Sequence, residues 1–224
     1  MRTREILKLA AGFRRFREKY FADSNARFAA GQTPKTLIIG CSDSRVDPAL
    51  ITSASPGELF IVRNVANLVP PHESSSVGRH GVSAAIEFAV SNLQVQNIII
   101  LGHRQCGGIR ALMSDLPAAK DSFIGKWMEI AEPARQKVLK AIPSQDLESQ
   151  CKACELESIV TSIENLKTFP FVREALDTRA LNILGIYFDL EQGTLLEYNE
   201  QSHSFETLPI GKLPEFTTSS FALL

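Results

Sequence analysis

Residues 97–108 read NIIILGHRQCGG, a stretch that joins an apolar run to a cluster of reactive side chains. The isoleucine-rich run is typical of a buried strand in a parallel sheet. It is followed at once by His103 and Cys106, two residue types that bind metals, and then by a glycine pair. In open α/β sheets, ligands bind beyond the carboxyl ends of such strands. The stretch therefore predicts a functional site directly after a buried strand.

Residues 36–45 read TLIIGCSDSR and repeat this arrangement earlier in the chain. An apolar run again ends in a metal-binding side chain, here Cys41. Together the two stretches supply two thiolates and one imidazole, a set that suits Zn²⁺ and leaves one coordination place open. An open place distinguishes a catalytic zinc site from a structural one. The sequence thus predicts a zinc site formed by Cys41, His103 and Cys106.

Three stretches make the chain resemble the β-class carbonic anhydrases, zinc enzymes that interconvert carbon dioxide and bicarbonate. They are CSDSR at 41–45, RNVANLVPP at 63–71 and HRQCGG at 103–108. The resemblance spans residues 32–196, and VPP at 69–71 and FPFVRE at 169–174 bring it closer to the plant-type branch. It implies reversible hydration of carbon dioxide to bicarbonate and a proton, with zinc-bound hydroxide as the nucleophile.

The side chains of Asp43 and Arg45 follow Cys41 closely and are expected beside the predicted zinc site. The resemblance implies that they form a catalytic pair. In it, Arg45 keeps Asp43 ionised and oriented so that Asp43 accepts a hydrogen bond from the zinc-bound hydroxide. An ordinary salt bridge within a loop is the alternative that the residues alone leave open.

The resemblance places Gln32, Phe60 and Phe88 around the substrate. Gln32 would donate to a bicarbonate oxygen, while the two phenylalanines would form apolar walls suited to carbon dioxide. Gly107 joins this set because it is expected where a helix starts, with free backbone donors that can face an anion. A tight turn that needs glycine is the alternative there. Phe88 and Arg104 depart from the tyrosine and serine that the family usually has at these positions.

A different departure concerns regulation. In the regulated branch of the family, a tryptophan, an arginine and a tyrosine build an inhibitory bicarbonate pocket. The matching positions here are Ile38, Arg63 and Phe188, so only the arginine remains. We therefore expect no allosteric inhibition by bicarbonate.

Other functions remain open from the sequence. Cys151 and Cys154 form a C-x-x-C pair that would close a structural zinc site, although burial as small apolar residues is the commoner fate of such a pair. A hydrolase of carbonyl sulfide or carbon disulfide on the same scaffold is a second alternative. A non-enzymatic interaction protein stabilised by zinc is the third.

Composition excludes several classes of protein. The 224 residues are 44% hydrophobic, which fits one domain over residues 1–224. The net charge of -1 gives no electrostatic case for binding nucleic acid. No apolar run approaches the ~20 residues that span a bilayer, and no signal-peptide pattern opens the chain. We therefore expect a cytoplasmic location, where a reducing environment keeps the thiols free.

The pattern of apolar residues predicts an α/β fold, with a mainly parallel central sheet flanked by helices and an antiparallel edge hairpin near the C-terminus. Strands are expected near 35–40, 59–63, 97–101, 181–189 and 194–198, with a hairpin turn at 191–193. Helices are expected at 3–21, 80–93 and 150–167, within 118–141 with a break at Pro133, and from Gly107 or Gly108 to before Pro117.

The two ends of the chain are expected to serve assembly. An N-terminal arm, residues 1–30, contains the helix at 3–21, whose aromatic and aliphatic side chains form one stripe. The resemblance implies that such helices lie across a partner subunit in a homodimer or higher homo-oligomer, with the active site at the dimer interface. Packing of the helix on its own domain is the alternative. The C-terminal tail, residues 203–224, is a candidate for pairing with another subunit.

Overall fold

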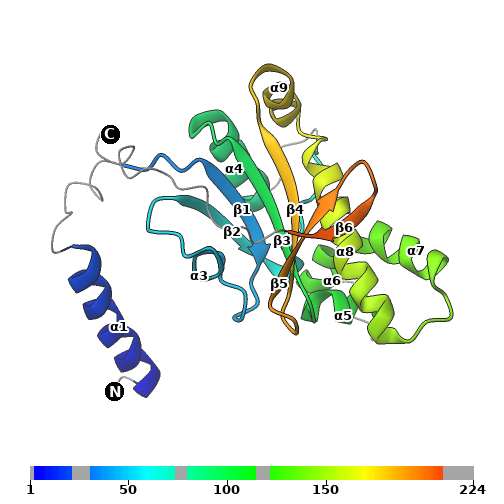
Figure 1. Ribbon diagram of the computed structural model, residues 1–224, viewed down its shortest axis with the longest axis horizontal. Helices are drawn as coiled ribbons and strands as arrows, with labels where there is room; N and C mark the ends of the chain where they lie inside the picture. Colours follow the sequence, from blue (N-terminus) through cyan, green and yellow to red (C-terminus); the bar gives the residue numbers. More distant parts are fainter. Residues whose placement is uncertain (1–2, 22–30, 74–79, 115–121, 209–224) are drawn as a thin grey trace.

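The structure is a computed structural model that describes residues 3–21, 31–73, 80–114 and 122–208. Its centre is a six-stranded sheet in the order β2-β1-β3-β4-β5-β6 (Figure 1). The strands are β1 (Thr36–Cys41), β2 (Leu59–Asn64), β3 (Asn97–His103), β4 (Asn182–Asp189), β5 (Thr194–Asn199) and β6 (Ser204–Thr207). The first four are parallel, and β5 and β6 are antiparallel. The predicted fold class is confirmed.

The helices of the described residues are α1 (Arg4–Tyr20), α3 (Pro48–Thr52), α4 (Gly81–Glu87), α5 (Gly107–Met113), α6 (Phe123–Met128), α7 (Glu132–Ala141), α8 (Leu147–Leu166) and α9 (Pro170–Thr178). All of them except α1 lie around this sheet, and α1 stands apart from it (Figure 1). A π-helical turn, Phe88–Asn92, extends α4. Sequence patterns predicted all of these except α3 and α9, which are short and begin with a proline. Pro117, the expected limit of the helix after Gly107, lies outside the described residues.

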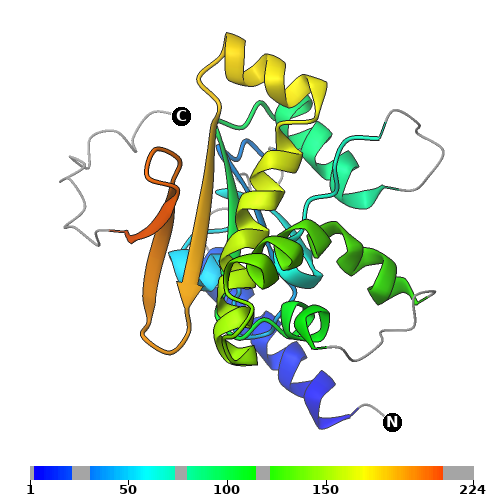
Figure 2. The same cartoon turned by 90° about the vertical axis from the view of Figure 1, so that its right-hand side faces the viewer.

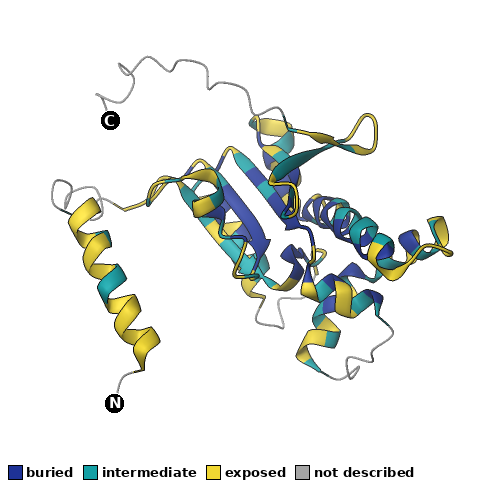
Figure 3. Cartoon of the chain, turned by 60° about the horizontal axis from the view of Figure 1, so that its bottom comes forward, coloured by how far each residue is buried: buried dark blue, intermediate teal, exposed yellow. Residues whose placement is uncertain are grey.

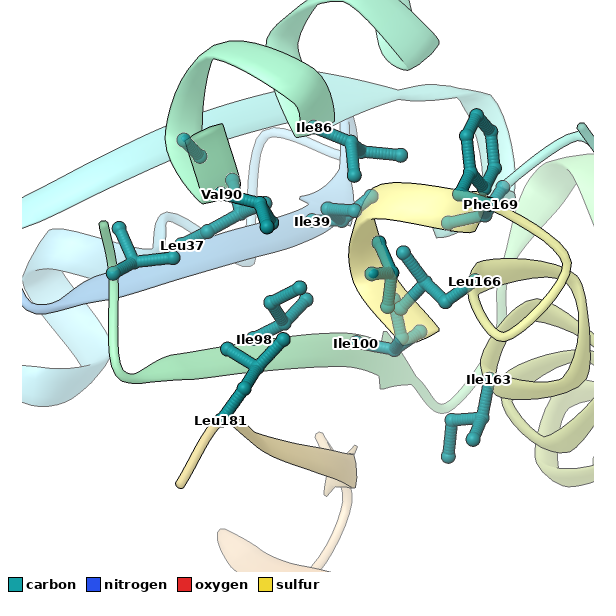
Figure 4. Close-up of a cluster of buried hydrophobic side chains, with 14 of the residues drawn as sticks. Leu37, Ile39, Ile86, Val90, Ile98, Ile100, Ile163, Leu166, Phe169 and Leu181 are labelled. Atoms are coloured by element: carbon teal, nitrogen blue, oxygen red, sulfur yellow. The ribbon is translucent and has the colours of Figure 1, made fainter. Parts of the chain in front are cut away.

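One face of the sheet carries the main core. Leu37 and Ile39 of β1 and Ile98 and Ile100 of β3 point toward α4, α8 and the start of α9 (Figure 4). Figure 2 shows α8 running along the sheet with α7 beside it. The close approach of α8 depends on Gly102, because a Cβ atom there would lie 2.7 Å from a side-chain carbon of Ile159.

The opposite face of the sheet is more thinly covered. Its buried residues are Ile38, Leu101 and Ile186, and α3 contributes Ile51 to them. Helix α1 buries none of its residues, and Phe13 is 62% exposed (Figure 3). The alternative in which α1 packs on its own domain is therefore not what the structure shows.

The C-terminal segment differs in part from expectation. Ser204–Thr207 forms β6, which pairs with β5 of the same chain. One edge of β6 is thus used within the chain, and because β6 is the last strand of the sheet, pairing of its other edge with another subunit stays a prediction; residues 209–224 lie outside the described part. None of the helices in the described ranges has the length and hydrophobicity required to cross a membrane.

Candidate metal centre and active site

The three predicted metal ligands lie together at the carboxyl ends of two neighbouring strands. Cys41 ends β1, His103 ends β3, and Cys106 precedes the first residue of α5. Their ligand atoms all lie within 4.8 Å of one another, and all three side chains are buried. No other group of three such side chains in the described ranges meets this criterion. The parallel pairing of β1 with β3 brings the two sequence stretches to the same edge.

The orientation of the His103 ring supports metal binding. Its Nδ1 atom lies 2.8 Å from the carbonyl oxygen of Arg104. Because a carbonyl only accepts hydrogen bonds, Nδ1 carries the proton and Nε2 presents a lone pair. Nε2 is buried and has no hydrogen-bond partner. A buried polar atom without a partner needs an explanation, and a metal ion would provide one.

The two thiols are arranged to give up protons to a cation. A hydrogen bond from Cys106 lowers the pKa of the Cys41 thiol, against the effect of burial, and His103 lowers it further. The same bond raises the pKa of Cys106, and burial adds to this effect. The two sulfur atoms are therefore hydrogen-bonded to each other, and a soft divalent metal that displaces the protons would gain two thiolates. The donor set of one nitrogen and two sulfurs fits Zn²⁺.

The cysteine pair on α8 does not join this cluster. Cys151 and Cys154 are buried, and neither belongs to the group of ligand atoms within 4.8 Å. Burial raises the pKa of both thiols, that of Cys154 to about 12. They behave as small apolar residues, so the closed structural site that they would have completed is not formed.

Asp43 and Arg45 form a two-bond salt bridge at the edge of the cluster. Arg45 donates from Nε to Oδ1 of Asp43 at 2.9 Å and from Nη2 to Oδ2 at 2.8 Å. The backbone N–H of Arg45 adds a third bond to Oδ1. These bonds hold the pKa of the Asp43 carboxyl well below its usual range. Because Oδ2 lies 4.0 Å from Nε2 of His103, this is not an ordinary loop salt bridge remote from the ligands.

Gln105, which lies between two metal ligands, was missed by the sequence interpretation. Its backbone carbonyl accepts a hydrogen bond from Nη2 of Arg45 at 3.1 Å. Its side chain donates to Glu191 in the β4–β5 turn at 2.7 Å. The φ angle of Gln105 is 59°, a left-handed conformation that non-glycine residues rarely adopt. Nothing in the sequence signals this conformation, because it follows from the turn that brings both ligands inward.

Arg63 fixes the chain that follows β1. It donates from Nε to the carbonyl oxygen of Cys41 at 2.9 Å and from Nη2 to that of Asp43 at 2.6 Å. Its third contact is a salt bridge to Asp47, at 3.2 Å. Asp47 in turn accepts hydrogen bonds at the start of α3. One guanidinium thus contacts three points of the loop between Cys41 and Asp47, which is also held by the bond from the Ser42 N–H to the carbonyl of Asn64.

The glycine pair has two separate roles. A Cβ atom at Gly107 would meet nothing within 4 Å, so open space faces this residue beside Cys106. A Cβ atom at Gly108 would lie 2.8 Å from a methyl group of Val65. Close packing therefore requires glycine at 108, and Gly107 leaves room for a small molecule.

The structure does not bring Gln32, Phe60 and Phe88 to the metal ligands of the same chain. The rings of Phe60 and Phe88 pack together, with centroids 5.9 Å apart. In the β1–β2 register, Cys41 pairs with Asn64. Phe60 lies four residues earlier in β2, or about 13 Å along a strand. Gln32 is exposed and precedes β1, whereas Cys41 ends it.

Arg104 and Glu155 form a buried ionic pair behind the ligands. Arg104, which departs from the serine usual in the family, is only 8% exposed. Glu155 accepts a hydrogen bond from the backbone N–H of Cys106. No sequence signal identifies Glu155, because it lies on α8, far from the ligands in the chain.

Comparisons with known proteins agree with this geometry. A protein-family model described as carbonic anhydrase matches residues 36–195. Beta carbonic anhydrase 3 of Arabidopsis thaliana is 37% identical over 195 residues, which cover 84% of this chain and 75% of that protein. The solved structure of the β-carbonic anhydrase CcaA is 32% identical, with a TM-score of 0.84, over 92% of this chain and 93% of that one. One of two tetrameric β-carbonic anhydrases from Sordaria macrospora is 29% identical, with a TM-score of 0.75, over 86% and 96%.

Proposed function

This chain belongs to the β-carbonic anhydrase family of lyases, and we propose that it catalyses the reversible hydration of carbon dioxide to bicarbonate and a proton. The 37% identity to a plant enzyme accords with the plant-type branch. The observation that carries the proposal is the unpartnered, buried Nε2 atom of His103, which faces two thiols beside an ionised Asp43.

We assign Cys41, His103 and Cys106 as ligands of Zn²⁺. When bound, zinc would lower the pKa of a coordinated water, so that a hydroxide nucleophile is available near neutral pH. Asp43 accepts a hydrogen bond from the attacking oxygen and so directs its lone pair toward the carbon of carbon dioxide. Arg45 holds the Asp43 carboxylate in place and, through Gln105, ties it to the ligand loop.

The substrate-binding residues require a second copy of the chain. Gln32, Phe60 and Phe88 lie toward the amino end of the sheet, away from the ligands of their own chain. In a homodimer, they would line the partner's metal site, while Gly107 would leave space for bicarbonate on the ligand side. The exposed apolar stripe of α1 supplies a surface for such contacts. A related structure is described as tetrameric, which supports assembly beyond a monomer.

The decisive experiment is carbon dioxide hydration, followed by stopped-flow proton release, with metal-loaded and chelator-treated protein. Activity should require metal and should return when Zn²⁺ is added back. Carbonyl sulfide and carbon disulfide should be tested in parallel. Protein that binds Zn²⁺ but hydrates no carbon dioxide would overturn the proposal. The site needs free thiols, so a reducing compartment such as the cytoplasm is part of the same proposal.

A further inference from the structure

Behind the metal ligands, a carboxylate from α8 is bonded to the ligand loop. We propose that Glu155 is a positioning residue for the ligand Cys106, and that Arg104 is the counter-ion that keeps this carboxylate in place. The inference rests on the proposed zinc site. It concerns residues that do not touch the substrate.

Both oxygens of Glu155 are used. Oε1 accepts a hydrogen bond from the backbone N–H of Cys106 at 2.9 Å, and Oε2 accepts one from the hydroxyl of Tyr187 at 2.8 Å. Glu155 is 2% exposed and Tyr187 is completely buried, so water does not compete for these bonds. A carboxylate fixed at both ends holds the Cys106 backbone in one position. That position determines where the Cys106 sulfur points.

Arg104 supplies the positive charge that such a buried carboxylate needs. Burying an unpaired carboxylate costs several kcal/mol, so an ionised Glu155 requires a cation nearby. The Nη1 atom of Arg104 lies 3.9 Å from Oε2 of Glu155. Nη2 pairs with Glu148 at 2.7 Å, and Nε lies 3.7 Å from Glu191. The buried guanidinium is therefore surrounded by three carboxylates, of which Glu155 is buried, while Glu148 and Glu191 are 47% and 52% exposed.

The geometry of Arg104 indicates that charge, and not a hydrogen bond, links it to Glu155. Nη1 and Nε of Arg104 are buried and have no hydrogen-bond partners. Its attraction to Glu155 is consequently electrostatic and is strengthened by the low dielectric of the interior. The backbone of Arg104 also accepts the hydrogen bond from Nδ1 of His103. One residue thus contacts His103 with its carbonyl and supports Cys106 through Glu155.

A role in the fold alone is the competing explanation, because Glu155 also joins α8 to β4 through Tyr187. The two explanations differ in what they predict for metal binding. Loss of a fold contact lowers the stability of metal-free and metal-loaded protein by similar amounts. Loss of a positioning contact additionally weakens the metal, so the stabilisation that Zn²⁺ adds should shrink.

The test measures the Zn²⁺ dissociation constant of full-length variants by competition with a chromophoric chelator, together with the melting temperature of metal-free protein. Glu155→Ala should weaken Zn²⁺ binding about 10- to 100-fold, the range found when outer partners of metal ligands are removed. Glu155→Gln should recover most of the affinity, since its amide oxygen still accepts from Cys106. Glu157→Ala is the matched control, because Glu157 lies on the same helix and pairs with Lys137.

The role of Arg104 is tested by removing its charge and by combining that change with a substitution of Glu155. Arg104→Met leaves Glu155 unpaired and should weaken Zn²⁺ binding, whereas Arg104→Met combined with Glu155→Gln should bind more tightly than Arg104→Met alone. In Co²⁺-substituted protein, the thiolate-to-metal absorption band should shift in Glu155→Ala and stay unchanged in Glu157→Ala.

The outcomes separate this inference from the proposed function. If Glu155→Ala keeps wild-type Zn²⁺ affinity while its melting temperature falls, Glu155 is structural and the inference is wrong. If Glu155→Ala does not fold, the comparison of Arg104→Met with the double variant decides, and the absence of coupling overturns the inference. If wild-type protein binds no Zn²⁺, or if Cys106→Ser binds it normally, the proposed metal site itself is wrong.

Discussion

Replacing Arg45 by methionine should remove most of the activity without removing the metal or the fold. The substitution breaks both side-chain bonds to Asp43 and the bond to the carbonyl of Gln105. Asp43 then has one backbone bond left to fix its orientation. We expect kcat/KM for carbon dioxide hydration to fall about 10- to 100-fold, as is typical when a partner of a metal-site group is lost. That range corresponds to about 1.4–2.7 kcal/mol of barrier.

The stability of the protein should change much less than its activity. The Arg45 side chain is 46% exposed, so its salt bridge is screened by water and is worth about 0–1 kcal/mol. The fold holds the pKa of Asp43 below its usual value, so its stabilising contribution is present above about pH 4 and is lost as the pH falls below that. Without Arg45 the main cause of this lowered pKa is lost, but the usual pKa of an aspartate, about 4, is still far below neutral pH, so Asp43 stays ionised at pH 7. The activity loss should consequently be the same at pH 7 and pH 9.

The assay is stopped-flow carbon dioxide hydration with a pH indicator, with Zn²⁺ content and melting temperature measured on the same samples. Arg173→Met, at an exposed arginine of α9, is the control and should behave as wild type. If Arg45→Met keeps kcat/KM within twofold of wild type at full Zn²⁺ content, the salt bridge is an ordinary surface pair. Asp43 would then need no fixed orientation.

Two further predictions concern metal and assembly. Serine at Cys41 or Cys106 replaces a soft thiolate by a poor ligand, so Zn²⁺ content and activity should fall together. The control, Cys154→Ser, should keep both. Full Zn²⁺ content in Cys41→Ser would show that the ligand set is wrong. Deleting residues 1–21 removes the apolar stripe of α1 and should weaken the dimer in light scattering. A stable, fully active monomer would contradict the two-chain site.

The metal ligands and the sheet could be predicted because their signals are local. Apolar β-branched runs indicate buried strands, and the residues that end them occupy one edge whatever the rest of the chain does. This rule alone was enough to predict that Cys41 and His103 lie close together. The short helix α3 could not be found by periodicity, since it has five residues. The strand β6 was missed because its residues are mostly exposed and polar.

The supporting groups could not be predicted because they reach the site through tertiary contacts. Glu155 is 49 positions from Cys106 in the chain, and its role depends on how closely α8 packs on β3. That packing is set by Gly102, whose importance is visible only when the distance to Ile159 is known. Likewise, Gln32 and Phe60 were assigned by resemblance alone. One chain shows only that they lie away from its own ligands.

Bicarbonate should not switch this enzyme off allosterically, and the structure explains why. An inhibitory anion at the matching positions would need donors from Ile38, Arg63 and Phe188. Ile38 is 1% exposed and packs with Phe188 in an apolar cluster, so neither offers a donor. Each nitrogen of Arg63 already donates one hydrogen bond, to the carbonyls of Cys41 and Asp43 and to Asp47, so only the second N–H of each terminal nitrogen is left for an anion.

An anion that entered there would lose its hydration without adequate hydrogen bonds in return, and it would have to break the contacts that hold the loop after β1. A ligand shifts a conformational equilibrium only if it binds one state more tightly than the other. Bicarbonate has no tighter binding site here in an inactive state. Asp43 should thus stay paired with Arg45 at neutral pH instead of moving onto the metal. Activity should rise with pH along a single titration, and added bicarbonate should inhibit hyperbolically, as a product does. Initial rates measured by stopped flow across a bicarbonate series at pH 7 and pH 8.5 test both statements. A steep, cooperative loss of activity with bicarbonate would mean that Arg63 can leave its carbonyl partners, and the fixed loop inferred from those bonds would be wrong.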